Sequence, residues 1–389
     1  MVFDPNAPAQ PGSGIFGLPH SEAEALVVLV PVPWEATTSY GGGAAEGPRA
    51  ILEASKQVDL FDLDVDRPYQ HGIHMLPIPS EIVAWNEEGK AAAEKVIEQG
   101  GAGDDPELVK ALARVNVLSE KVNEHVEREV ARLLAAKKIV GVVGGDHSVP
   151  FGALRAMAKQ LKRPFGVLHF DAHSDTRDAY EGFTHSHASI MHNVLEGVPE
   201  IEKLVQVGIR DVCEAEVRYC DSQGDRVDVF YDRNIARRKM EGEPFAQIAR
   251  EIAAALPNQG WVSFDIDGLD PRYCPHTGTP VPGGLELQEA IAVIREVVRA
   301  GKKIVGFDLN EVAPNLSNED DEWAGNVGAR LLYKLVAFTL ARQGQAKLAD
   351  CRAFTPSAPG SEAQPAGFGR ACDGRGLRHA IACVTLWPA

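Results

Sequence analysis

The stretch FGVLHFDAHSD, residues 165–175, passes directly from a mostly apolar run into a group of ionisable side chains. Residues 165–170 have the composition of a short strand that is buried on both faces of a sheet. The ionisable residues follow at once, in the spacing Asp171-x-His173-x-Asp175. Residues two apart on an extended chain point to the same side, so these three side chains can converge on one ligand.

Further apolar runs of strand length recur along the chain and alternate with helical patterns. Helices are indicated by apolar residues spaced three and four apart, as in residues 106–138 and 287–299. Strands that are separated by helices form a parallel sheet covered on both faces. We therefore predict an α/β fold of three layers, α-β-α, with a mostly parallel central sheet. Its other expected strands are residues 25–32, 139–143, 204–207, 227–230, 261–266 and 304–309.

The length of 389 residues fits one large α/β domain with appendages. Residues 1–22 are rich in Pro and Gly and predict an extended N-terminal arm that packs on a neighbouring subunit or stays mobile. Residues 23–345 form the expected catalytic domain, with an extended helical and loop region at 65–127 that is irregular from 65 to 105. Residues 346–389 are a C-terminal extension: a subunit contact, a disordered segment, or the product of an altered reading frame.

Composition argues against several classes of protein. Hydrophobic residues make up 44% and charged residues 24%, the balance of an ordinary globular protein. The net charge of −16 argues against a nucleic-acid or anionic-membrane partner and suits a small cationic substrate, although solubility alone also explains it. The N-terminus lacks the features of a secretion signal, no apolar run is long enough to span a membrane, and the six cysteines form no CxxC pair. We expect a cytoplasmic location.

Polar motifs follow three other expected strands at the point where each strand ends. They are GGDHS at 144–148, DIDGLDP at 265–271 and NEVAP at 310–314. The carboxyl ends of parallel strands lie at one edge of a sheet, and the ligands of such folds bind there. Each motif alone has a plainer explanation, since GGDHS suits a helix cap and a single DxD pair is commonly a turn. Together, in this order and position, the motifs predict a ligand site.

Four carboxylates and two imidazoles would meet at this edge of the sheet. Their mutual repulsion and their loss of hydration would cost roughly several kcal/mol unless cations neutralised them, which predicts bound metal ions. Mixed His and Asp ligation suits borderline divalent ions such as Mn²⁺, Ni²⁺ or Zn²⁺. The absence of cysteine from the set disfavours a closed structural zinc site.

These motifs, together with Thr277-Gly278-Thr279-Pro280 and Gly283-Gly284-Leu285, resemble those of the ureohydrolase family of arginases, agmatinases and guanidinases. The resemblance covers residues 25–342, which is most of the chain. It implies an arginase-like fold and a homo-oligomer, commonly a trimer or a hexamer. A related partner subunit is also compatible with it.

The resemblance implies two divalent metal ions per chain, Ni²⁺ or Mn²⁺, that share two carboxylates. Two adjacent ions lower the pKa of a shared water toward neutrality and present hydroxide to the guanidinium carbon. Hydrolysis of the C–N bond would release urea and an amine or ammonia. One ion would be held by His147, Asp171, Asp175 and Asp265, and the other by Asp171, His173, Asp265 and Asp267.

Further side chains receive roles from the resemblance. Glu311 matches the glutamate that binds the guanidinium group, and Thr279 is expected to contact the substrate. His187 matches the histidine that contacts the substrate and carries a proton to the leaving amine, with His185 as the second choice. Ala188 departs from the family pattern, in which a glycine commonly follows this histidine, so we expect a different pocket shape there.

Two more histidines lie near these motifs. We interpret His169 as a buried residue that packs or supports a metal ligand, on the face of its strand opposite Asp171. We interpret His192 as part of a helix face or rim. Neither is expected to bind metal.

The sequence does not determine which guanidine compound is the substrate. The loop 175–186 offers no obvious Ser and Asn pair to hold an amino-acid head group, and region 65–127 is longer than in the shorter agmatinases. Guanidine or a small N-substituted guanidine or biguanide is the first choice, with agmatine or a guanidino acid such as guanidinobutyrate close behind. Two other classes remain: a deacetylase-like hydrolase with a single zinc ion, and a non-catalytic subunit of a mixed oligomer.

Overall fold

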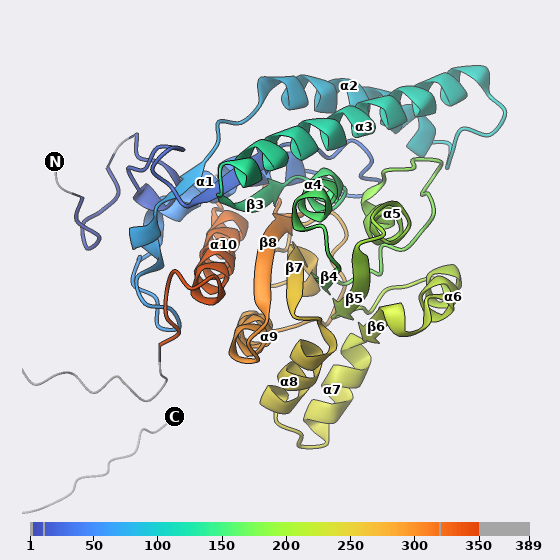
Figure 1. The fold of residues 1–389 in the computed structure, drawn as a ribbon. Helices are drawn as coiled ribbons and strands as arrows, with labels where there is room; N and C mark the ends of the chain where they lie inside the picture. The colour runs from blue at the N-terminus through green and yellow to red at the C-terminus, as the bar shows by residue number, and fades with distance from the viewer. Residues whose placement is uncertain (1–2, 11, 319, 350–389) are drawn as a thin grey trace, which may run out of the picture. The chain divides into compact units, whose positions relative to one another are not determined.

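A computed structural model describes residues 3–10, 12–318 and 320–349, and these residues form a parallel sheet flanked by helices (Figure 1). The described sheet has eight strands in the order β2-β1-β3-β8-β7-β4-β5-β6, and every pair of neighbours is parallel. The predicted fold class is confirmed. The strands are β1 (Val27–Val32), β2 (Ile73–Met75), β3 (Ile139–Gly144), β4 (Phe165–Phe170), β5 (Ile201–Val207), β6 (Val227–Phe230), β7 (Gln259–Asp265) and β8 (Lys303–Asn310).

Two hydrophobic clusters lie on the two faces of the sheet, because successive residues of each strand point to opposite sides. One layer of helices packs on the first cluster and includes α1 (Gly47–Ala54), α7 (Asp232–Met240), α8 (Phe245–Ala255), α9 (Leu287–Arg299) and α10 (Trp323–Arg342). The other layer includes α2 (Ser80–Ile97), α3 (Pro106–Ala135), α4 (Phe151–Leu161), α5 (Ile190–Gly197) and α6 (Glu214–Ser222). Figure 1 shows α8, α9 and α10 on one side and α2 to α5 on the other.

The prediction that residues 65–105 are irregular is wrong, because they contain α2 and the short edge strand β2. The buried face of α2 is marked by Ile82, Asn86, Gly89, Ala93 and Val96, a helical spacing in which polar and small residues replace large apolar ones. Gly89 is required where α2 meets the loop after β1, since a Cβ there would lie 2.9 Å from Ala36 Cβ. A hydrophobic pattern therefore does not reveal this helix.

The helix α3 begins as its sequence predicts. The side chain of Asp105 accepts hydrogen bonds from the backbone N–H groups of Glu107 and Leu108, and Pro106 occupies the first turn. Together with α2 it forms a long hairpin that covers the same face of the sheet as α4 (Figure 1). This hairpin accounts for most of the extended region predicted at residues 65–127.

The N-terminal arm packs partly on its own chain. Ile15, Phe16 and Leu18 are buried in the first cluster, and the Phe16 N–H donates to Ser55 Oγ at 2.9 Å. A large part of the predicted C-terminal extension, residues 350–389, lies outside the described residues. Within the described part of the chain, no helix combines the length and apolar character needed to cross a membrane.

Candidate metal centre

The candidate ligands come from four strands that are neighbours in the sheet. His147 follows β3, Glu311 follows β8, Asp265 ends β7 and Asp171 follows β4, and the sheet order is β3-β8-β7-β4. Because all four strands run in the same direction, their carboxyl ends meet at one edge. The strand order therefore brings together residues that are up to 164 positions apart in the sequence.

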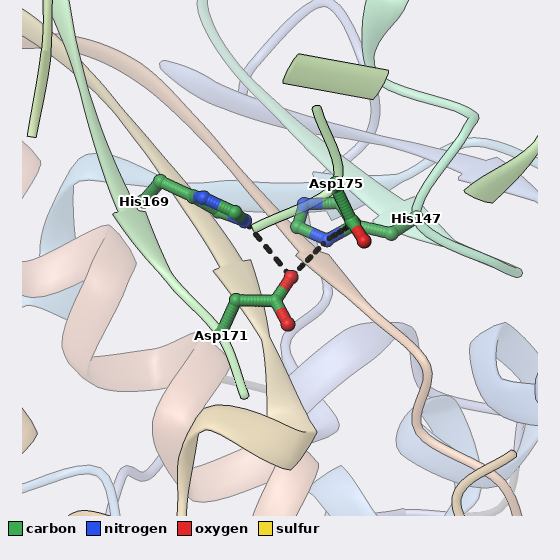
Figure 2. A group of neighbouring side chains, drawn as sticks. All are labelled: His147, His169, Asp171 and Asp175. Carbon is green, nitrogen blue, oxygen red and sulfur yellow. Dashed lines mark hydrogen bonds and ion pairs between the residues drawn. The ribbon is translucent and has the colours of Figure 1, made fainter. Parts of the chain in front are cut away.

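Three carboxylates lie near one nitrogen of His147 and form a first group with it, and Figure 2 shows two of them, Asp171 and Asp175. His147 Nδ1 lies 2.9 Å from Asp171 Oδ2, 3.3 Å from Asp265 Oδ2 and 3.4 Å from Asp175 Oδ2. Three carboxylate oxygens thus lie close to one imidazole nitrogen. Among the described residues, the potential ligand atoms that lie within 4.8 Å of one another here belong to His147, His169, Asp171 and Asp175, and Asp265 is not among them. Imidazole nitrogens and carboxylate oxygens are the donors that borderline divalent cations prefer.

A second group lies on the other side of the Asp171 carboxylate. His173 Nδ1 is 3.0 Å from Asp267 Oδ2 and 3.4 Å from Asp171 Oδ1. Asp171 therefore directs Oδ2 toward the first group and Oδ1 toward the second. A carboxylate in that position can join two cations.

Burial and repulsion from neighbouring carboxylates raise the pKa values of Asp175 and Asp265. Asp171, Asp175, Asp265 and Asp267 are all buried. Burial, together with the nearby Asp171, raises the pKa of Asp175 to about 8. Burial and the neighbouring Asp267 raise the pKa of Asp265 well above its ordinary value. Such a crowd of buried acids is stable in ionised form only beside positive charge, so the residues fit a metal centre.

The far nitrogen of His147 fixes how the ring faces the carboxylates. Nε2 lies 2.9 Å from Ser263 Oγ, and that hydroxyl donates to Asp308 Oδ1 at 2.9 Å. Ser263 has then used its proton, so it accepts the Nε2–H of His147. Nδ1 is thereby turned toward the three carboxylates. Burial opposes protonation of His147, but hydrogen bonding to Asp171, Asp175 and Asp265 prevails and raises its pKa well above the ordinary value, so a bound cation would replace the Nδ1 proton. Sequence reasoning missed Ser263 and Asp308.

Glu311 contacts the loop that carries His147. The His147 N–H donates to Glu311 Oε1 at 2.9 Å, whereas Glu311 Oε2 is buried and has no hydrogen-bond partner among the described residues. Burial, with the nearby Asp146, raises the pKa of Glu311 well above its ordinary value. Glu311 and Asp175 both have positive φ, 61° and 55°, which costs backbone energy in residues other than glycine and is common at functional sites.

A cavity of about 530 Å³ opens beside the second group. His187 and Thr279 line it together with His173 and Asp175. Burial, followed by the charge of His173, lowers the pKa of His187 to about 4. His185 lies elsewhere: its Nε2 is 3.2 Å from Glu120 Oε2 of α3. The structure thus brings His187 and Thr279 to the cavity, but directs His185 toward α3.

The predicted orientation of His169 is wrong. Its Nε2 lies 2.8 Å from Asp171 Oδ2, so the two side chains are on the same side of the chain (Figure 2). The two-residue repeat of an extended chain requires this, since His169 and Asp171 are two positions apart. Its burial and its contact with Asp171 agree with the other part of the interpretation. His192 lies on α5, with its ring 4.9 Å from that of Tyr219.

The parallel sheet and the buried groups of acids and histidines define an α/β protein with a candidate metal centre at the carboxyl ends of its strands. The chain belongs to the arginase family, whose model matches residues 25–337. It is accordingly a hydrolase of the kind that cleaves guanidino C–N bonds.

Relatives and solved structures agree with this assignment. The N(1)-aminopropylagmatine ureohydrolase of Synechocystis is 31% identical over 322 residues, covering 82% of this chain and 90% of the relative. The agmatinase of Klebsiella pneumoniae is 30% identical over 325 residues, covering 83% and 90%. The proclavaminate amidino hydrolase of Streptomyces clavuligerus has the same fold, with a TM-score of 0.64 at 24% identity over 87% of this chain and 100% of that structure.

Proposed function

We propose that this chain is a ureohydrolase that uses two divalent cations to release urea from a small guanidine-type substrate. The observation that carries the proposal is the position of Asp171, whose two carboxylate oxygens face two separate groups of donors. A deacetylase-like centre with one zinc ion would need only one such group. Two groups that share a carboxylate favour a pair of cations.

The residues that would hold the cations are those expected from the sequence. His147, Asp171, Asp175 and Asp265 would hold one, and Asp171, His173, Asp265 and Asp267 the other. When bound, divalent cations of this kind lower the pKa of water toward neutrality and so supply hydroxide at physiological pH. The donor set suits Mn²⁺ and Ni²⁺ alike, because both accept mixed imidazole and carboxylate ligation.

Glu311 and His187 would act on the substrate. The buried Oε2 of Glu311 has no hydrogen-bond partner among the described residues and would accept guanidinium N–H groups, while Oε1 is held by the His147 N–H. His187 lines the cavity, and its low pKa keeps the ring neutral at pH 7. It would therefore pass a proton on to the leaving amine and would not remain protonated between turnovers. Thr279 would contact the substrate from the opposite loop, residues 276–281.

Guanidine, or a small N-substituted guanidine or biguanide, remains our first choice of substrate. The loop 175–186 contributes Arg177 and Tyr180 to the lining of the cavity. These two residues do not form the Ser and Asn pair that would hold the head group of an amino acid. The second candidate is an agmatine-type substrate with a longer chain. It is favoured by a cavity of about 530 Å³, which exceeds what guanidine alone would fill, and by the activities for which the relatives are named.

The test is urea release by purified protein loaded separately with Mn²⁺ and with Ni²⁺. The substrates are guanidine, N-methylguanidine, a biguanide, agmatine, 4-guanidinobutyrate and arginine, and Asp267→Ala is the blank. Urea from one substrate, absent in the blank, supports the proposal and names the substrate. If two bound ions per chain are measured and no substrate yields urea, the proposal fails. A partner-dependent or non-catalytic subunit would then be the better hypothesis.

We further propose that the protein acts in the cytoplasm as a homo-oligomer, a trimer or hexamer, as expected from the sequence. Native mass spectrometry of the purified chain measures the assembly directly. A monomer that gains activity only when a related subunit is added would contradict a homo-oligomer and favour a mixed one.

A further inference from the structure

A row of polar side chains crosses the buried sheet next to the metal centre. The strand register places Gln206 of β5 beside His169 of β4, His169 beside Ser263 of β7, and Ser263 beside Asp308 of β8. All four residues are 0% exposed. Their polar atoms must therefore form hydrogen bonds with other buried groups of the protein. Whether each of these groups donates or accepts determines which ring nitrogen of a histidine carries a proton.

Hydrogen-bond partners at both ends of the Gln206 amide fix its orientation. Gln206 Nε2 lies 2.7 Å from the backbone oxygen of Ser174, an atom that can only accept a hydrogen bond. Gln206 Oε1 accepts from Ser174 Oγ at 3.1 Å. A reversed amide would bring two oxygens within 2.7 Å of each other, so this orientation is the stable one. The second N–H of Gln206 is then directed at His169 Nδ1, 3.1 Å away.

This contact determines which nitrogen of His169 carries the proton. Nδ1 accepts from Gln206, so it is unprotonated, and the single proton of the neutral ring lies on Nε2. Nε2 faces Asp171 Oδ2 at 2.8 Å (Figure 2). We infer that Gln206 holds His169 in its Nε2–H tautomer, so that His169 is a constant hydrogen-bond donor to Asp171 and not a metal ligand.

The inference rests on the proposed role of Asp171 as a shared metal ligand. His169 Nε2 lies within ligand distance of the group formed by His147, Asp171 and Asp175, and a lone pair there would add a nitrogen to the centre. With a proton on Nε2, His169 instead holds Asp171 Oδ2 in place. His147 presents its other nitrogen to the same carboxylate, because Ser263 accepts its Nε2–H and Nδ1 faces Asp171 Oδ2 at 2.9 Å. His169 and Gln206 are thus positioning residues.

The first test needs no metal. In the metal-free full-length chain, ¹⁵N NMR of labelled histidines distinguishes protonated from unprotonated ring nitrogens, and His169 is assigned by the signals lost in His169→Gln. We expect Nε2 to be protonated and Nδ1 not. In Gln206→Met, which has a similar shape and no donor, we expect the proton to populate Nδ1. A proton on Nδ1 of the wild type, alone or together with one on Nε2, would overturn the inference.

Cys220→Ala is the matched control for this experiment. Cys220 Sγ lies 3.9 Å from Gln206 Oε1, at the opposite end of the amide from the N–H that meets His169. The variant opens buried space beside Gln206 but leaves the donor in place, so we expect the His169 tautomer to be unchanged. A shift as large as that in Gln206→Met would mean that repacking, not the lost donor, moves the proton, and would overturn the role of Gln206.

The second test measures Ni²⁺ affinity by competition with a chelator, with folding checked by thermal unfolding. His169→Leu removes the donor and should weaken binding about 10- to 100-fold, whereas His169→Gln supplies another N–H and should retain most of the affinity. Equal losses in both variants, or no loss in His169→Leu, would overturn the inference. Failure of the proposed function is distinct, since it would appear as metal-loaded wild-type protein that releases no urea, while the results for the His169 tautomer and for Ni²⁺ affinity still held.

Discussion

The backbone N–H of His147 donates to Glu311 Oε1 at 2.9 Å, although 164 residues separate the two in sequence. The contact links the loop after β3 to the loop after β8, which are neighbouring strands of the sheet. One carboxylate oxygen of Glu311 thus helps to hold the loop of His147, and the other has no hydrogen-bond partner among the described residues. The proposed function assigns Glu311 both structural support and substrate binding, and these two roles can be separated by mutation.

Glu311→Gln should weaken substrate binding while sparing the metal centre. The amide oxygen can still accept from the His147 N–H, but the negative charge that would pair with a guanidinium is gone. Removal of one partner of a buried charge pair costs about 2–5 kcal/mol, which corresponds to roughly 30- to 5,000-fold in kcat/KM. Steady-state kinetics and metal analysis check this. Loss of metal with unchanged kcat/KM per bound ion would argue that Glu311 is purely structural.

His187→Asn and His185→Asn should have unequal effects on catalysis. His187 lines the cavity, whereas His185 is directed at Glu120. Loss of a positioned proton-transfer group lowers the rate about 10²- to 10⁴-fold, so we expect that fall in kcat for His187→Asn and little change for His185→Asn. Kinetics of both variants under saturating substrate measure the difference. A greater fall in His185→Asn would reverse the assignment.

The metal-free protein should lose stability as pH rises toward 8. Burial and the nearby Asp171 raise the pKa of Asp175 from 3.8 to about 8. Burial opposes protonation of His173, but the Asp267 carboxylate prevails and raises its pKa to about 12. Between about pH 6.5 and pH 8, where histidines of lowered pKa such as His187 are mostly neutral in both states, the folded chain therefore holds protons that the unfolded chain has released, so the free energy of unfolding falls as pH increases. Denaturant unfolding at several pH values tests this.

Added metal should reverse that trend. A cation binds the ionised carboxylates, so it must displace the extra protons, and this becomes easier as pH rises. At 100 times its dissociation constant a ligand stabilises the folded state by about 2.7 kcal/mol, and we expect the gain from Mn²⁺ or Ni²⁺ to grow between about pH 6 and pH 8. Thermal unfolding with and without metal measures the gain. A gain that is independent of pH would contradict proton displacement.

Arg210→Ala should loosen the loop that carries Asp267. The Arg210 guanidinium donates to the backbone oxygen of Asp267 at 2.6 Å and to that of Val281 at 2.9 Å. Loss of these charge-assisted bonds should reduce the free energy of unfolding by about 2–4 kcal/mol. Arg210→Lys keeps the charge but not the planar fork, so we expect a loss between wild type and Arg210→Ala. Denaturant titration of the three proteins compares them, and an unchanged midpoint in Arg210→Ala would refute the role.

The sequence predicted the strands well because buried parallel strands are almost continuously apolar. Residues 165–170 and 227–230 were placed at the bounds seen in β4 and β6. Acids and histidines that directly follow such runs could be assigned to one sheet edge. The helix α2 was not predicted, because its buried face contains Asn86, Gly89 and Ala93, which give no apolar periodicity.

The supporting contacts of the site depend on strand register, which the sequence does not display. Ser263 and Asp308 are paired across β7 and β8, and Gln206 meets His169 across β4 and β5. Each of these residues lies in an apolar strand, where a single polar side chain has no evident partner until the neighbouring strand is known. The incorrect prediction for His169 has a different cause and did not depend on strand register. Residues two apart on a strand point to the same face, so the sequence alone already places His169 on the same face as Asp171.

The strand order also constrains when the centre can come into being during protein synthesis. β8 is the last strand of the described sheet in sequence, yet it lies between β3 and β7. A nascent chain that ends between residues 268 and 302 contains every expected metal ligand but lacks β8, the central strand that holds the two halves of the sheet side by side. The ribosome must therefore release nearly the whole domain before the cations can be captured, and the cell meets a metal-free intermediate on every round of translation.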